Sequence, residues 1–160
     1  GSYCMTRKGS ALSALPHMTG APAVQYDHNF VEDLEQFWAM VKDAAQRKYI
    51  MTSSTHETCL NESAGTEKRR MGIISGHSYS ILEAHAFKHN GERVKLLKLR
   101  NPHGNREWEG DWSDKSDRWT ESTKKQVNLV EDNDGTFWIS FADYDLFFYI
   151  TTICYFRDDF

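Results

Sequence analysis

The chain has 160 residues, of which 39% are hydrophobic and 26% charged, and its formal net charge is −4. This composition is typical of a folded globular domain rather than a disordered chain, and the weak acidic balance gives no argument for binding nucleic acid or an anionic membrane. No apolar run approaches the ~20 residues of a membrane-spanning helix, so no transmembrane segment is expected.

The N-terminal part predicts a lead-in followed by one long helix. Residues 1–25 are rich in Gly, Ser, Ala, Pro and Thr, which indicates irregular structure. Asp27 or Asn29 can cap a helix that runs to about Lys48. Its apolar residues recur at steps of three and four and form one face: Phe30, Leu34, Phe37, Trp38, Val41 and Ala45.

The rest of the chain predicts antiparallel strands with shorter helices. Residues 76–87 and 93–100 are expected to pair as strands, because Asn90-Gly91 between them is a strong tight-turn signal. Further strands are expected at 49–52, 136–140 and 149–156, short helices at about 117–127 and 141–148, a surface loop at 53–72 and a long connection at 101–119. The expected fold class is α+β, with antiparallel strands packed as a sandwich or open barrel.

A histidine and an asparagine stand at the two ends of the predicted hairpin. His77 follows Gly76 at the start of the first strand, and Asn101 precedes Pro102 after the second. Both ends lie away from the Asn90-Gly91 turn, so the two side chains should be close. A thiol protease needs an imidazole that takes and returns a proton and a third group that orients the ring. On the residues alone, a structural histidine and an ordinary turn remain an open alternative.

Several motifs in order resemble the calpain family of calcium-dependent, papain-like cysteine proteases. They are Gly76-His77-Ser78-Tyr79-Ser80, Leu97-Lys98-Leu99-Arg100-Asn101-Pro102-x-Gly104, Glu107-Trp108-x-Gly110-x-Trp112-Ser113-Asp114 and Asp134-Gly135-Thr136-Phe137-Trp138-Ile139-Ser140-Phe141. The likeness covers nearly the whole chain and matches the second, histidine-bearing half of the protease core. It implies that residues 1–25 are the tail of the preceding half and that residues 26–160 form this half.

The resemblance also implies the roles of individual residues. His77 would be the catalytic base and acid, and Asn101 would orient it. His103 stands where most calpains have a tryptophan that packs beside the catalytic residues. The resemblance gives Trp108 and Trp112, like Trp138, no chemical role, and they are expected to pack in the core or loops.

No cysteine of this chain has the setting of the family's nucleophile, which lies in the first half among glycine and tryptophan. Cys4, Cys59 and Cys154 are widely spaced and odd in number, which favours reduced thiols in a cytoplasmic protein. The Cys-bearing first half is therefore an expected partner, and the chain alone is expected to be inactive.

Four loop carboxylates are candidates for holding calcium, which takes six to eight oxygen ligands. By the resemblance, Glu107, Asp114 and Asp134 match ligand positions and Asp132 matches a backbone-carbonyl position, whereas Thr136 replaces a usual glutamate. Solvated acidic turns are the alternative. Zinc is a weaker possibility, because the candidate histidines lack a zinc-binding motif. These histidines are His85, His89 and His103.

The expected function is limited proteolysis of protein substrates by a calcium-dependent endopeptidase to which this chain supplies His77 and Asn101. The alternative is a catalytically inactive, calcium-responsive scaffold or interaction module. His103 and Thr136 favour the scaffold, whereas the intact histidine and asparagine favour the protease.

Overall fold

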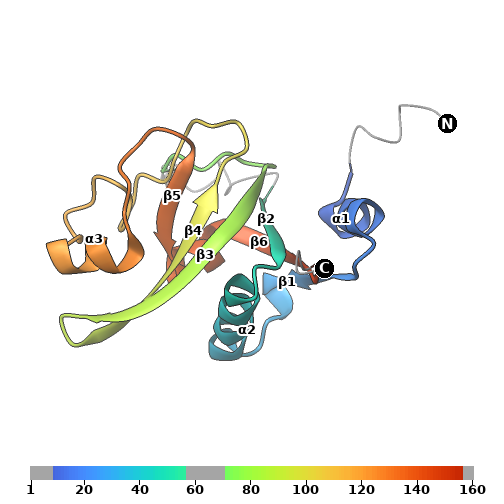
Figure 1. Ribbon diagram of the computed structural model, residues 1–160, viewed down its shortest axis with the longest axis horizontal. Coiled ribbons are helices and arrows are strands. Elements are labelled where there is room, and N and C mark those ends of the chain that lie inside the picture. The colour runs from blue at the N-terminus through green and yellow to red at the C-terminus, as the bar shows by residue number, and fades with distance from the viewer. Residues whose placement is uncertain (1–8, 57–70, 157–160) are drawn as a thin grey trace, which may run out of the picture.

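The computed structural model describes residues 9–56 and 71–156. Helix α1 lies beside strand β1 at one end of the molecule, and α3 lies at the opposite end (Figure 1). The elements are α1 (Ala11–Thr19), β1 (Ala23–Asp27), the 3-10 turn η2 (His28–Phe30), α2 (Leu34–Gln46), β2 (Ile50–Thr55), β3 (Ser78–His89), β4 (Glu92–Arg100), α3 (Glu121–Val127), β5 (Thr136–Ser140), α4 (Phe141–Phe147) and β6 (Phe148–Cys154).

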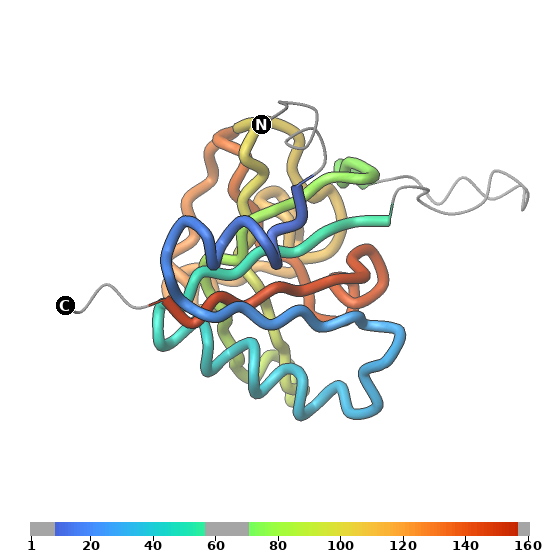
Figure 2. The backbone as a smooth tube through the Cα atoms, turned by 90° about the vertical axis from the view of Figure 1, so that its right-hand side faces the viewer, coloured from blue at the N-terminus to red at the C-terminus, as the bar shows by residue number. Residues whose placement is uncertain are grey.

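The described strands form a single antiparallel sheet in the order β1-β6-β2-β3-β4-β5. Figure 2 shows β2, β6 and β1 side by side, with the C-terminal strand β6 between the other two. A register shift between Ile81 and Glu83 interrupts the β3–β4 pairing, as expected of a bulge that increases local twist. The mixed helix and antiparallel-sheet class is confirmed, whereas a sandwich or open barrel is not.

The predicted hairpin is confirmed. Asn90 and Gly91 form its turn with φ angles of 51° and 84°, a region that asparagine and glycine tolerate. The pairing of β3 with β4 runs from His89 opposite Glu92 to Ser80 opposite Arg100. The residues just before β3 and just after β4 therefore meet at the end of the hairpin that lies away from the turn.

The early helix begins later than predicted. Asp27 caps only η2, whereas the side chain of Asp33 accepts hydrogen bonds from the backbone N–H groups of Glu35 and Gln36 and caps α2. Phe30 lies outside the helix and is 82% exposed. Leu34 at the start of α2 is 47% exposed as well. The rest of the predicted apolar face is buried together with Ala44: Phe37, Trp38, Val41 and Ala45.

The expected irregular lead-in is wrong for residues 11–19, which form α1. The Ser10 side chain caps the start of this helix, and Gly20 ends it in the left-handed region at φ 73°. Strand β1 crosses residue 25 and pairs with β6, so residues 23–27 belong to this sheet. Small residues such as Ser10 and Gly20 favoured the irregular prediction, but in the structure these two cap the helix.

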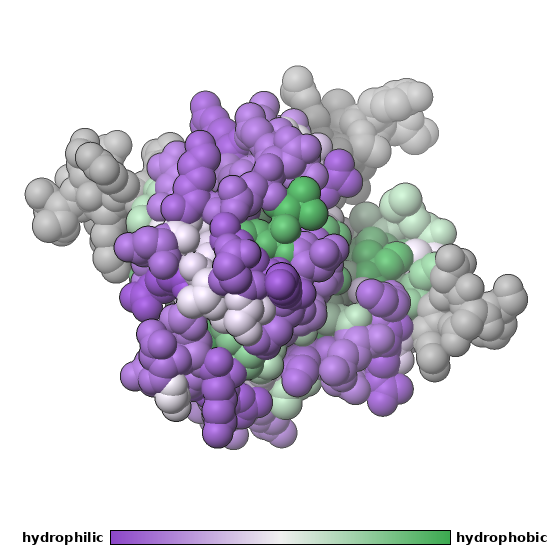
Figure 3. Space-filling model, turned by 60° about the vertical axis from the view of Figure 1, so that its left-hand side comes forward, coloured by the Kyte–Doolittle hydropathy of each residue, from purple (hydrophilic) through white to green (hydrophobic). Residues whose placement is uncertain are grey.

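Aromatic side chains dominate the core, as their 13% share of the sequence suggests. One cluster lies between α2 and the sheet and includes Trp38, Tyr79 and Phe137, and a second one near α3 contains Trp112, Trp119 and Trp138. Trp108 is also buried, so the packing roles expected of the three motif tryptophans are confirmed. The face seen in Figure 3 is mainly hydrophilic, with a small hydrophobic group near its centre.

Among the helices of the described ranges, none is long and apolar enough to cross a bilayer.

A buried histidine fastens η2 to the sheet. The His28 side chain is 5% exposed, its Nε2 lies 2.8 Å from Thr151 Oγ1, and its Nδ1 lies 3.3 Å from Asp145 Oδ1. The imidazole packs against the rings of Phe37 and Tyr144. Burial lowers the pKa of His28, and the nearby carboxylate of Asp145 offsets only part of this effect. The folded protein therefore favours the neutral ring.

This burial predicts a loss of stability in acid. The unfolded chain, with a histidine pKa of about 6.5, binds more protons than the folded chain just below that pH. We expect the free energy of unfolding to fall between about pH 7 and about pH 5.5, and to fall less in His28→Gln. Urea denaturation at both pH values measures the free energy of unfolding of each protein. An equal decrease in the wild type and in His28→Gln would contradict the prediction.

Candidate active site

His77 and Asn101 are brought together at the open end of the β3–β4 hairpin. His77 directly precedes β3 and Asn101 directly follows β4. The Nε2 atom of the imidazole lies 2.9 Å from the Asn101 side-chain oxygen Oδ1. The proximity predicted from the sequence is therefore observed, and it has the length of a hydrogen bond.

The amide of Asn101 is held in one orientation by the backbone around it. Asn101 is fully buried, and its Nδ2 donates to the carbonyl oxygens of Asn105 and Arg106. Its Oδ1 also accepts the N–H of His103 at 3.0 Å. Because Nδ2 faces carbonyl oxygens, Oδ1 must face His77, and the imidazole must donate through Nε2.

Thr55 at the end of β2 holds the backbone of His77. Its Oγ1 accepts the His77 N–H at 3.0 Å and donates to Ile74 O at 2.7 Å, while its own N–H donates to His77 O at 3.0 Å. Thr55 is 1% exposed. Gly76, in the left-handed region at φ 59°, donates its N–H to His56 O. The turn that presents the imidazole is thus tied to a third strand.

Two rings contact the imidazole. Tyr79 lies edge-on to it, with the ring centroids 5.0 Å apart, and its hydroxyl accepts the Ile74 N–H. The exposed His103 lies on it with a centroid distance of 4.6 Å and an angle of 50° between the planes. His103 therefore covers part of His77 from solvent.

This arrangement can serve proton transfer. With Nε2–H bonded to Asn101, the lone pair of His77 resides on Nδ1, where it can accept a proton. His77 is only partly buried, so a reacting group can approach it. A base oriented by a second side chain is the arrangement that nucleophilic catalysis requires.

Two of the four candidate metal carboxylates influence each other. Asp114 Oδ1 is buried and has no hydrogen-bond partner within the described residues. Burial and, next, the negative charge of Glu107 raise the pKa of Asp114 to about 6, while the backbone N–H of Asp132 counteracts them. A partner-less carboxylate oxygen beside a second carboxylate fits the chemistry of a hard cation.

The other two carboxylates are more exposed. Asp134 accepts the N–H of Thr136 through Oδ1 at 2.7 Å. Hydrogen bonding from the Thr136 side chain and, next, from this N–H lowers the pKa of Asp134. Asp132 is exposed. Within residues 9–56 and 71–156, no three His, Cys, Asp or Glu side chains converge as a ready-made metal site. Any calcium site here would need backbone or water oxygens as well.

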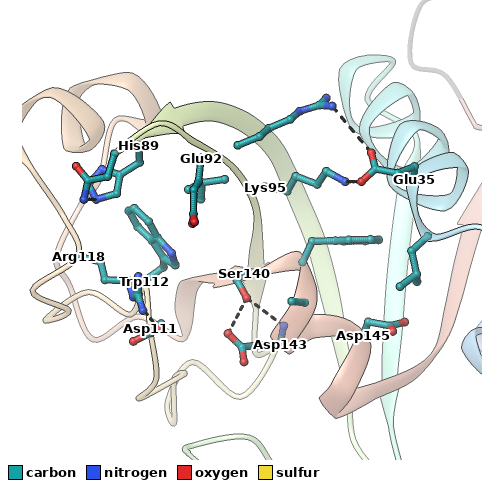
Figure 4. Close-up of a pocket in the computed structure, with 16 residues that line it drawn as sticks. Glu35, His89, Glu92, Lys95, Asp111, Trp112, Arg118, Ser140, Asp143 and Asp145 are labelled. Carbon is teal, nitrogen blue, oxygen red and sulfur yellow. Dashed lines mark hydrogen bonds and ion pairs between the residues drawn. The ribbon is translucent and has the colours of Figure 1, made fainter.

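A separate cavity of about 650 Å³ lies at the other end of the hairpin, against α2, α4 and Trp112 (Figure 4). Its charges are largely paired: Lys95 binds Glu35, and Arg118 lies 2.7 Å from Asp111. The first ion pair connects the hairpin to α2, and the second lies within the 101–119 connection. The cavity contains neither candidate catalytic residue and none of the four candidate calcium carboxylates, although His89, one of the candidate zinc histidines, lines it.

Comparison with known proteins gives one family. Residues 1–155 match the model described as "Calpain family cysteine protease". The chain belongs to the calpain family. It is 32% identical to mouse Calpain-9 over 157 residues, 35% identical to Calpain clp-4 of Caenorhabditis elegans over 148 and 32% identical to Drosophila melanogaster Calpain-A over 162. These alignments cover 96%, 90% and 96% of the chain but 22%, 20% and 19% of the relatives.

The calpain chain spans about a fifth of the length of these relatives. The family to which the chain belongs is described as one of cysteine proteases.

Cys154 does not lie near the imidazole of this calpain chain. It is fully buried in β6 and pairs with Ile50, five residues along β2 from Thr55, which corresponds to about 16 Å. Cys4 and Cys59 lie outside the described residues. Sequence reasoning missed Thr55, because a threonine at a strand end has no distinctive signal, whereas Tyr79 stands within the histidine motif.

The contacts of Thr55 predict a stability effect. Thr55→Val keeps the shape but leaves the Ile74 carbonyl and the His77 N–H without their side-chain partner. We expect it to lower the free energy of unfolding by about 1–3 kcal/mol and to shift the NMR signals of the His77 ring. Thr55→Ser keeps the hydroxyl and should preserve those signals. Equal ring signals in Thr55→Val and the wild-type calpain chain would refute the positioning role.

Proposed function

We propose that the chain is the histidine- and asparagine-bearing half of a calpain-type cysteine endopeptidase core, the second subdomain of a papain-like fold. The hydrogen bond of 2.9 Å between His77 and Asn101 supports this most directly. The nucleophilic cysteine would come from the other half of the core, which is then an obligatory partner. The parent would carry out limited proteolysis of protein substrates.

In this mechanism His77 Nδ1 takes the proton of the cysteine thiol, and the thiolate attacks the scissile carbonyl carbon. The imidazolium then gives the proton to the leaving amine, which leaves a thioester. His77 next takes a proton from a water molecule, whose oxygen attacks the thioester carbonyl carbon. The C–S bond then breaks, and the imidazolium returns the proton to the thiolate, which regenerates the thiol. Asn101 holds the ring through Nε2 throughout. A neutral amide suffices, because the thiolate itself stabilises the imidazolium.

The rival function, an inactive scaffold, is less well supported. A scaffold needs no oriented imidazole, whereas the Asn101 side chain bonds His77 through Oδ1 and is itself held by the backbone of residues 103–106. His103 lies on the imidazole, and we propose that it shields the catalytic ring in place of the usual tryptophan. A cytoplasmic location remains a prediction.

We also propose that the parent depends on calcium. Glu107 and Asp114 would supply carboxylate ligands, Asp134 a further one and Asp132 a backbone carbonyl. The buried, partner-less Oδ1 of Asp114 supports this assignment. Bound Ca²⁺ would neutralise the mutual repulsion of Glu107 and Asp114. Thr136, an uncharged residue at a further ligand position, should weaken binding.

The proposed catalytic roles predict the following. The isolated chain should show no turnover of an unstructured protein substrate, because it lacks the nucleophile. In the longer protein that contains it, His77→Ala should lower kcat/KM by at least about 10²- to 10⁴-fold. Asn101→Ala should cause a smaller loss. Turnover by the isolated chain that depends on His77, or full activity of His77→Ala in the parent, would contradict the proposal.

The calcium site predicts an effect on stability. Because the folded-state pKa of Asp114 is raised from 3.8 to about 6, its ionisation destabilises the fold as the pH rises through that range. We expect Asp114→Asn to melt at a higher temperature than wild type at neutral pH without calcium. Millimolar calcium should raise the melting temperature of this variant less than that of the wild type. Asp117→Asn, which changes an exposed carboxylate, is the matched control. If calorimetric titration of the wild type with calcium shows no heat of binding, the site is rejected.

A further inference from the structure

The backbone of Gly135 contacts both candidate sites at once. Its N–H donates to Glu107 Oε1 at 2.8 Å, and its carbonyl oxygen accepts the Asn101 N–H at 2.8 Å. Glu107 is a candidate metal ligand and Asn101 orients the imidazole. The two sites are therefore joined through a single residue that has no side chain of its own.

Close packing makes this connection stiff. Gly135 is buried at φ 85°, and a Cβ atom there would lie 2.8 Å from Asn101 O and 2.8 Å from Gly104 Cα. Gly104 in turn donates its N–H to Asn101 O at 2.9 Å. The 101–104 turn thus rests directly on Gly135, backbone against backbone. Because such contacts leave little free space, a displacement of Gly135 must move Asn101.

We propose that Gly135 is a positioning residue that couples the Glu107 carboxylate to the hydrogen bond between Asn101 and His77. Fixing Glu107 fixes Gly135, which fixes the Asn101 amide and hence the imidazole. The catalytic relevance of this connection rests on the proposed function. The backbone connection itself requires no cation.

NMR of the isolated chain tests the connection without calcium. Glu107→Ala removes the acceptor of the Gly135 N–H, so the signals of the Asn101 side-chain amide and the His77 ring should shift. The Asn101 backbone amide should exchange about 2- to 10-fold faster, as expected for the weakening of one hydrogen bond. Glu107→Gln keeps an acceptor oxygen and should resemble wild type. Glu109→Ala, which removes an exposed carboxylate from the same loop, is the control.

The outcomes separate the connection from the calcium proposal. Shifts at His77 in Glu107→Ala, but not in Glu107→Gln or Glu109→Ala, support the coupling even if calcium titration of the wild type leaves every signal unchanged. In that case only the calcium proposal fails. Unchanged His77 and Asn101 signals in Glu107→Ala overturn the coupling, whether or not calcium binds. If circular dichroism shows that Glu107→Ala is unfolded, Glu107→Asp replaces it, because its side chain is shorter by one methylene and withdraws the acceptor oxygen. The same NMR signals are then compared.

Discussion

The antiparallel register of β3 and β4 is the constraint on which the candidate site depends. The tight turn at Asn90 and Gly91 sets this register, so the residues before β3 and after β4 meet about nine residues away from it. A slip of one residue would turn the inward side chains of the shifted strand to the opposite face. The buried leucines of β4, packed in the core, oppose such a slip. Hydrophobic burial along the hairpin therefore stabilises a polar contact at its end.

The imidazole is positioned by segments that are distant in sequence. Thr55 of β2 holds its backbone, Asn101 after β4 holds its ring, and Gly135 before β5 holds Asn101. The connections made by Thr55 and Gly135 involve backbone groups, which have less freedom than a long side chain, whereas Asn101 and His77 are joined through their side chains. The imidazole therefore has one orientation only when β2 and the segments that flank β3, β4 and β5 are all in place. The aromatic clusters on the sheet supply the rigid support that such a site needs.

The sequence predicted the hairpin, the strand over 136–140 and the proximity of His77 and Asn101, because turn chemistry and strand alternation are local signals. It did not predict α1, where capping by Ser10 and Gly20 outweighed a composition typical of loops. It also placed the start of α2 too early, because Asp27 and Asp33 are equally good caps by type. Thr55 and Gly135 could not be recognised, since their roles arise from strand order and backbone contacts rather than from a motif.

The position of β6 in the sheet has a consequence for how the domain assembles. This strand comes last in sequence among the described strands, yet it lies between β1 and β2, which both precede it by more than about 90 residues. Neither neighbour can complete its pairing until residues 148–154 have been synthesised. The sheet thus closes through contacts of long sequence separation, which makes folding slow and leaves strand edges exposed on the ribosome. Thr55, which pairs with Phe148 of β6, would acquire its final surroundings only after residues 148–154 have been synthesised.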